Sequence, residues 1–217
     1  MALTYNQLVT AVEDYTENYE TTFIAHIPTF IRQAEQRIVN VVQHPQFRTS
    51  TTTSTMTAGN RYMTAPTGFM APFEFIVIDG AGDHHYLLQK DVSWIREAYS
   101  DPTDTGLPEY YALYSQTQFL FARTPDANYA TEINYFAYPQ SLVDAGTTNT
   151  TWLSTYFDSA LLWGTLVEAY IFMKGEADML AAYDKQFKEA LGMFKQLGEN
   201  KERKDAYRTP QQRIQEF

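Results

Sequence analysis

The stretch SALLWGTLVEAYIFMKG, residues 159–175, is the most apolar run in a chain of 217 residues whose formal net charge is −10. A helix built from it is hydrophobic nearly all round, and such a helix is either buried on all sides or lies in lipid. A membrane span needs about 18 or more apolar residues. This run is shorter, and Glu168 stands near its middle, where a carboxylate is costly to insert. The pattern therefore predicts a central core helix, or a helix half buried in its own chain and half in a neighbouring subunit.

The first 45 residues predict two helices. Thr4 and Gln7 have the spacing of a capping box, and apolar residues follow at helical intervals to about residue 18. A second helix is predicted to begin at Pro28, where the missing amide hydrogen is harmless, and to stop before His44-Pro45. Its apolar stripe contains Phe30, Ile31, Ala34, Ile38 and Val41 or Val42, with Arg32, Glu35, Gln36 and Arg37 outside it.

The middle of the chain, residues 46–148, predicts a β-rich insertion. The stretch RTSTTTSTMTAG, residues 48–59, is rich in β-branched and polar residues and predicts a strand exposed on one face. Two hairpins are also expected, with turns at 79–82 and 115–117. Alternation over residues 130–138 gives a further strand, for about five or six in all. This spacing is typical of a small sheet or sandwich.

Helical periodicity returns after Asn149, and the opening run is predicted to end with Gly175 as its C-cap before a fourth helix. The predicted fold is therefore α+β, a four-helix bundle interrupted by a β-rich insertion, with an extended C-terminal arm. The expected domains are a helical bundle over 1–45 and 149–197, a β-rich insertion over 46–148, and an arm over 198–217.

Glu168 is the one carboxylate inside the apolar helix, and it has two readings. Burial can perturb the pKa of such a group and give it a functional role. More often a buried carboxylate pairs with an arginine, and Arg32 or Arg37 on the second helix is the expected partner. The structural pairing is the favoured interpretation.

Composition and motifs argue against an enzyme. The chain has no cysteine, which excludes disulfides, thiolate metal sites and cysteine nucleophiles. It also lacks a nucleophile elbow, a phosphate-binding loop, a dinucleotide fingerprint and an H-E-x-x-H zinc motif. His84 and His85 are expected to point to opposite faces of a strand, which disfavours a shared metal ion. We therefore expect no catalytic site, no metal and no cofactor.

Sixteen tyrosines leave a second function class open. Aromatic side chains can stack on sugars or fill a protein interface, and the interface is the more general use. The tyrosines on predicted strands include Tyr110, Tyr111, Tyr114, Tyr135 and Tyr138.

Charge is distributed unevenly along the chain. Residues 195–217 hold six basic and four acidic side chains, a net of +2, whereas the remaining 194 residues hold ten basic and 22 acidic, a net of −12. An acidic body repels nucleic-acid backbones, so sequence recognition of DNA or RNA is not expected. A mildly basic tail indicates an arm that binds a different surface.

The N-terminus lacks a basic leader and an apolar core of signal length, which favours retention in a cytoplasm.

The order of several short patterns resembles a known family. These are HIPTFIRQAEQRIVNVV, then NRYMTAPTGFMAPFEFIVIDG and DTGLPEYYALYSQTQFLFARTPDANYATEINYFAYPQSL, and finally TTWLSTYFDSALLWGTLVEAYIFMKGEADMLAAYDKQFKEAL. Together they resemble the head-to-tail adaptor proteins of tailed bacteriophages, especially short-tailed ones. The resemblance covers about residues 22–197.

The resemblance implies a non-enzymatic virion protein, made in the cytoplasm of the host bacterium. Such adaptors form a ring, usually of twelve copies, between the portal protein and a tail tube or nozzle protein, and genomic DNA passes through the channel. An acidic body suits this role because DNA must slide without adhering. No membrane partner is expected. Two alternatives remain open: a tail-tube subunit of the same virion, and a carbohydrate-binding or depolymerising tail component.

The resemblance to head-to-tail adaptors implies a binding role for two surfaces of the chain. The apolar helix is expected to contact the next subunit around Trp163, Gly164 and Tyr170, with Gly164 marking a close helix contact. The C-terminal arm is expected to bind the portal and to become ordered on docking. Its candidate contact residues are Lys201, Arg203, Lys204, Tyr207, Arg208, Pro210, Arg213, Ile214 and Phe217.

Overall fold

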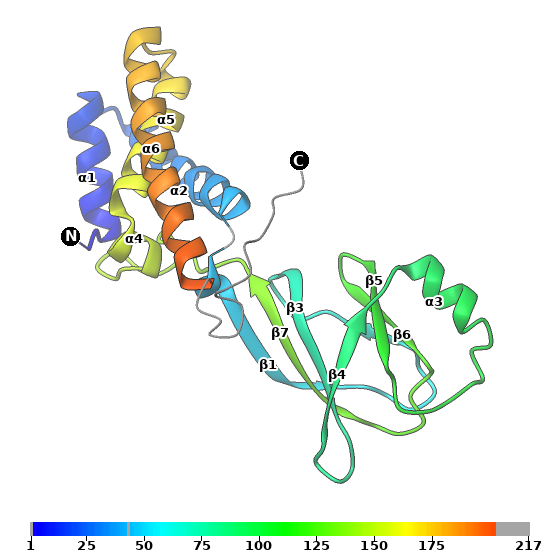
Figure 1. Ribbon diagram of the computed structural model, residues 1–217. Helices are drawn as coiled ribbons and strands as arrows, with labels where there is room; N and C mark the ends of the chain where they lie inside the picture. The colour runs from blue at the N-terminus through cyan, green and yellow to red at the C-terminus, as the bar shows by residue number, and fades with distance from the viewer. Residues whose placement is uncertain (1, 43, 203–217) are drawn as a thin grey trace. The chain divides into compact units, whose positions relative to one another are not determined.

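The chain forms two compact units. A computed structural model describes residues 2–42 and 44–202, with the backbone alone for residues 53 and 199–202. One unit, the helical unit, comprises Met1–Pro45 and Pro139–Phe217, and the other, the β unit, comprises Gln46–Tyr138. Residues 139–148, which the sequence analysis placed in the β-rich insertion, cluster with the helices. The fold class is α+β (Figure 1).

Within its described residues, the helical unit contains four long helices and one short one. The short helix, α4, was not predicted, because the helical periodicity after residue 149 predicts one continuous helix. In the structure that helix is broken at Phe157, whose φ of −137° lies outside the helical region. The helices are α1 (Tyr5–Thr16), α2 (Thr21–Val41), α4 (Trp152–Tyr156), α5 (Asp158–Met173) and α6 (Ala177–Glu202).

Local signals explain where α1 and α2 begin. The expected capping box at the start of α1 is present, because Thr4 and Gln7 exchange hydrogen bonds between side chain and backbone. The predicted start of α2 is wrong, because the helix begins seven residues before Pro28. A proline inside a helix forfeits one backbone hydrogen bond. The additional turns bury Phe23 and Ile27, and this burial favours the longer helix.

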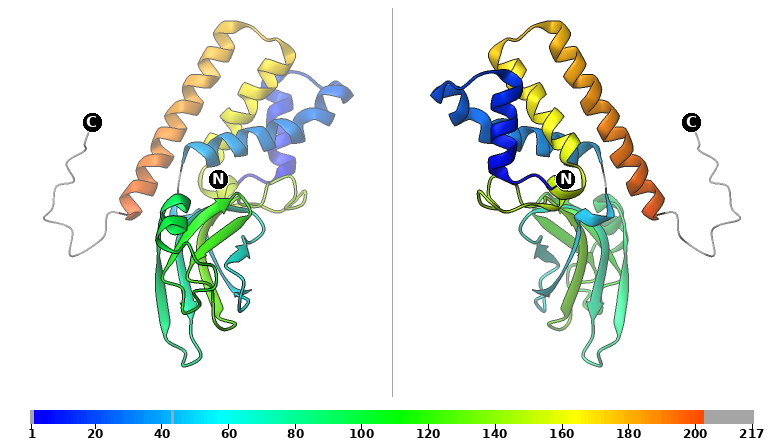
Figure 2. Two further views of the ribbon diagram at one scale, coloured as in Figure 1. Left: turned by 90° about the vertical axis from the view of Figure 1, so that its right-hand side faces the viewer. Right: turned by 90° about the vertical axis from the view of Figure 1, so that its left-hand side faces the viewer.

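The opening run of the sequence forms α5, and it is the core helix of its unit. α1, α2, α4 and α6 all pack against it, and α6 runs back alongside it (Figure 2). Half of its 16 residues are buried. The predicted C-cap is displaced by one residue, since Lys174 adopts the left-handed conformation with φ of 54°. Gly175 instead leaves room for the Tyr170 ring, because a Cβ at position 175 would lie 2.5 Å from Cδ1 of Tyr170.

The β unit is built on one curled sheet of seven strands in the order β1-β7-β3-β4-β5-β6-β2 (Figure 1). Neighbouring strands are antiparallel except β4 and β5, which are parallel and are joined through helix α3. The strand that sequence reasoning missed is β2, which has three residues. The elements are β1 (Arg48–Thr55), β2 (Tyr62–Thr64), β3 (Phe69–Ile78), β4 (His84–Gln89), α3 (Val92–Ala98), β5 (Tyr110–Ser115), β6 (Gln118–Ala122) and β7 (Ala130–Ala137), preceded by a 3-10 turn (Pro45–Phe47).

Each face of this sheet has its own apolar core. On one face α3 covers β5 and β6, where Ile95 packs on Ala112, Leu120 and Ala122. The other face carries the larger core, which is rich in aromatic rings in edge-to-face contact. Its most deeply buried members are Phe75, Val77, Phe119, Phe121 and Ile133.

Candidate functional site

The carboxylate inside α5 is paired with an arginine. Oε1 of Glu168 lies 2.8 Å from Nη2 of Arg37, and the Glu168 side chain is 9% exposed. The approach lacks hydrogen-bond geometry, so the contact is an ion pair held by charge. Half of the Arg37 side chain remains exposed, which reduces the cost of burying the pair. This contact joins α2 to α5, which is the structural reading of Glu168.

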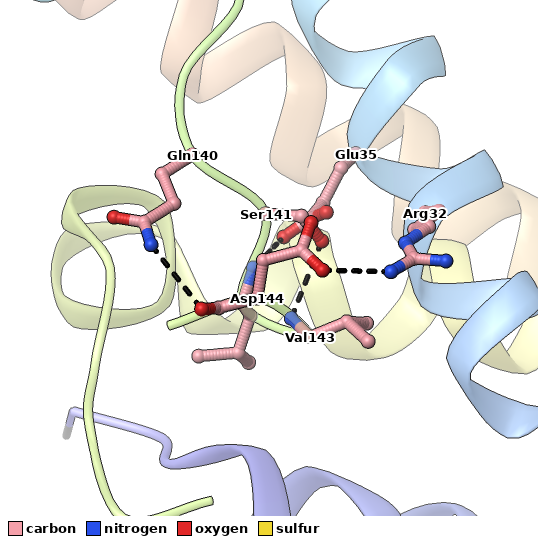
Figure 3. Close-up of polar contacts among 7 residues, drawn as sticks. Arg32, Glu35, Gln140, Ser141, Val143 and Asp144 are labelled. Atoms are coloured by element: carbon pink, nitrogen blue, oxygen red, sulfur yellow. Dashed lines mark hydrogen bonds and ion pairs between the residues drawn. The ribbon is translucent and has the colours of Figure 1, made fainter. Parts of the chain in front are cut away.

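The second expected partner, Arg32, makes a different contact. Its Nη2 lies 2.7 Å from Oδ1 of Asp144, in the segment that returns from the β unit (Figure 3). Both side chains are more than half exposed. An ion pair of this kind contributes about 0–1 kcal/mol to stability. The prediction that Arg32 could pair with Glu168 is therefore wrong, since Arg32 forms an exposed ion pair with Asp144.

A second carboxylate on α2 is buried, against expectation. Glu35 was placed outside the apolar stripe, yet it is 9% exposed and Oε1 accepts a hydrogen bond of 2.8 Å from the amide of Leu142 (Figure 3). Burial raises its pKa, and hydrogen bonds from the Leu142 amide and the Ser141 side chain oppose that rise. Glu35 thus fastens the returning segment to α2. The sequence signal for the burial of Glu35 was its spacing. The apolar residues Ile31 and Val39 lie one helical turn before and after it, on the same face of α2.

The three candidate interface residues of α5 make contacts inside the chain. Gly164 is buried between α2 and α6, so it marks a close helix contact of the subunit itself. Trp163 and Tyr170 are half-buried, and both rings pack against Tyr183 of α6. These contacts leave only part of each ring available to a neighbour.

Exposed apolar surface on α5 lies instead at its C-terminal end. Ile171 and Phe172 are 50% and 46% exposed. The Phe172 ring lies 5.2 Å from that of Phe30 and 5.0 Å from that of His26, both on α2. The end of α5 therefore presents a half-open aromatic cluster, which sequence periodicity did not distinguish from the buried part of the helix.

The arm falls almost wholly outside the described residues. α6 runs to Glu202, so residues 198–202, which the sequence analysis assigned to the arm, are helical. Lys201 lies in this last turn. The other candidate arm residues lie outside the described part of the chain, namely Arg203, Lys204, Tyr207, Arg208, Pro210, Arg213, Ile214 and Phe217.

The β unit contains the tyrosines considered for sugar binding and the histidines considered for a metal site, and it does not gather the tyrosines on one surface. Tyr111 and Tyr135 are buried in the larger core, whereas Tyr114 and Tyr138 are exposed, so the strand tyrosines form no single stacking platform. His85 Nε2 lies 2.9 Å from Oδ2 of Asp79 at the β3–β4 turn. Within residues 2–42 and 44–202, no group of three or more His, Asp or Glu side chains is arranged to hold a metal ion.

Sequence comparison places these features in a family. The profile of the SU10 adaptor protein family matches residues 3–214, nearly the whole chain. No curated protein matches the sequence significantly. Among the described residues, no helix combines the length and the apolar character needed to cross a membrane. The chain belongs to the SU10 adaptor protein family and is a structural, non-enzymatic head-to-tail adaptor of a phage virion.

Proposed function

We propose that this adaptor forms a ring, of twelve copies, that joins the portal protein to the tail tube or nozzle protein and lines the channel through which DNA is ejected. The observation that carries the proposal is the family match over residues 3–214. The charge of the chain supports it: residues 1–194 have a net charge of −12, and like charge keeps DNA from adhering to a channel wall.

The helical unit is proposed to act as a four-helix bundle that packs against its neighbours in the ring. α5 supports this role because it holds α1, α2 and α6 together while its end stays open. Ile171 and Phe172 supply exposed apolar area there, with the outer parts of Trp163 and Tyr170 beside Tyr183 as secondary contacts. A heterologous contact of this type repeats until the ring closes.

The C-terminal arm is proposed to bind the portal. Residues 203–217 contain four basic and two acidic side chains, a net of +2, together with Tyr207, Ile214 and Phe217. Basic and apolar side chains in alternation suit an acidic partner surface with apolar pockets.

A truncation tests the arm. A chain ending at Glu202 keeps α6 complete, so circular dichroism should match the full chain while capture by immobilised portal is lost. Neutralising Arg208 and Arg213 should weaken capture, and neutralising Lys185 and Lys188 on α6, the matched control, should not. Unchanged capture by the truncated chain would reject the arm as the portal contact. Capture by tail proteins in place of the portal would favour a tail-tube subunit.

A further inference from the structure

An exposed aromatic surface that carries two positive charges lies beside α3 in the β unit. Nζ of Lys90 is 5.1 Å from the ring centre of Trp94, and the Arg96 guanidinium is 5.3 Å from that of Tyr114. Trp94 and Tyr114 are 38% and 43% exposed. Two further rings extend the surface, since Tyr110 packs edge-on against Trp94 and Tyr62 does so against Tyr114. The six residues Tyr62, Lys90, Trp94, Arg96, Tyr110 and Tyr114 are called the cationic patch.

The two charges of this patch have no carboxylate partner among the described residues. The three other cations of the β unit are used within it. Arg48 lies 3.9 Å from the ring centre of Phe73, Arg61 donates to backbone carbonyls, and Arg123 pairs with Glu109.

The carboxylate nearest to Lys90 in sequence is already engaged. Asp91 caps α3 and accepts hydrogen bonds from the amide and hydroxyl of Ser93. Glu97 follows Arg96 on α3, and adjacent helical residues do not face each other. The patch therefore presents positive charge on a unit that holds five basic and ten acidic side chains.

The helical unit carries a surface of the opposite character at the end of α1. Residues 13–20, EDYTENYE, contain four carboxylates, and no lysine or arginine precedes Arg32 in the chain. Tyr15 and Tyr19 are 46% and 64% exposed within this segment. These eight residues are called the acidic segment.

Local hydrogen bonds fix the shape of the acidic segment. The Tyr19 hydroxyl donates to Oδ1 of Asp14 at 3.2 Å, and the side chain of Asn18 accepts from the amide of Glu20. Glu17 ends α1 in the left-handed conformation. Hydrogen bonds within the segment therefore hold its carboxylates and tyrosines in a defined arrangement.

We propose that the acidic segment of one copy docks on the cationic patch of the next copy. The inference rests on the proposed ring, because a ring of more than two subunits requires two different surfaces that complement each other. The two surfaces have opposite charge, and both present aromatic side chains, the residue type enriched in interface cores. A cation held over one ring face can still attract a carboxylate and the face of a second aromatic ring.

A charge exchange tests the pairing in the ring assembled on the portal. Lys90→Glu with Arg96→Glu should lower ring occupancy about tenfold or more, and so should Glu17→Lys with Glu20→Lys. All four changes in one chain restore opposite charges and should restore the ring. The matched control, Lys185→Glu with Lys195→Glu, changes the net charge equally but lies on α6 and should leave occupancy unchanged.

A covalent link gives an independent readout, because the chain contains no cysteine. A chain carrying Glu17→Cys and Arg96→Cys should form a ladder of disulfide-linked oligomers when its ring is oxidised. Glu17→Cys with Lys195→Cys should form none.

The outcomes separate the two proposals. Normal rings from the charge-reversed variants, or no ladder from the Glu17→Cys, Arg96→Cys chain, overturn the pairing and leave the adaptor ring standing. Failure of the unaltered chain to form a ring overturns the proposed function and this inference with it.

Discussion

Gly164 is the position where the packing of the helical unit is most easily tested. A Cβ built there would lie 2.9 Å from Cε2 of Phe187 on α6 and 3.1 Å from Cβ of Ala34 on α2. Both distances are shorter than ordinary van der Waals contact. Phe187 is 5% exposed and Ala34 is fully buried, so neither can move into solvent. Gly164→Ala therefore forces α2 or α6 away from α5.

The size of the effect follows from two opposing terms. Overpacking a well-packed core costs about 1–3 kcal/mol. Replacing glycine by alanine inside a helix returns up to about 1 kcal/mol. Gly192 on α6 isolates the second term, because a Cβ there meets nothing within 4 Å. The difference between Gly164→Ala and Gly192→Ala is thus the packing cost itself, about 1–3 kcal/mol.

Urea unfolding followed by circular dichroism at the helical wavelength measures this difference, because the four long helices belong to one unit. Gly164→Ala should lower the unfolding midpoint and Gly192→Ala should raise it slightly. If the two variants are equally stable, the close approach of three helices at Gly164 is wrong.

Three further substitutions address the polar contacts and the end of α5. Arg37→Met leaves the Glu168 carboxylate buried without its partner, so it should cost about 1–3 kcal/mol in urea unfolding, and adding Glu168→Gln should recover part of that loss. Burial raises the pKa of Glu35 above 4.5, so the folded state binds a proton where the unfolded chain does not. Stability should therefore rise as pH falls through the raised pKa toward 4.5, and unfolding measured across that range should show a smaller rise in Glu35→Gln. Gly175→Ala brings a Cβ against the Tyr170 ring and should lower the unfolding midpoint, whereas a midpoint equal to that of the unaltered chain would contradict the contact.

Periodicity predicted most of the helical unit, and it failed where burial outweighed a local rule. The prediction that the second helix stops before His44-Pro45 is confirmed, since α2 ends at Val41. The prediction that it begins at Pro28 is wrong, because burial of Phe23 and Ile27 favours helix on the N-terminal side of this proline. Of the two candidates for the last stripe position, Val42 is buried and Val41 is exposed. One sequence cannot weigh such tertiary burial against a local signal.

The β unit was predicted as a small sheet or sandwich with two hairpins, but the order in which its strands pair was not predicted. The turns at 79–82 and 115–117 follow from glycine and polar residues, but the parallel pairing of β4 with β5 depends on contacts through α3 that no local pattern encodes. The three-residue β2 is too short to alternate visibly. Glu35 was missed for a related reason, because its partner, the Leu142 amide, lies 107 residues away.

Electron microscopy of the purified chain mixed with its portal tests the central claim most directly. We predict a closed ring of twelve copies on the tail-facing side of the portal, absent from portal alone and absent when residues 203–217 are removed. A portal that stays bare at saturating concentrations of the unaltered, folded chain would contradict the account.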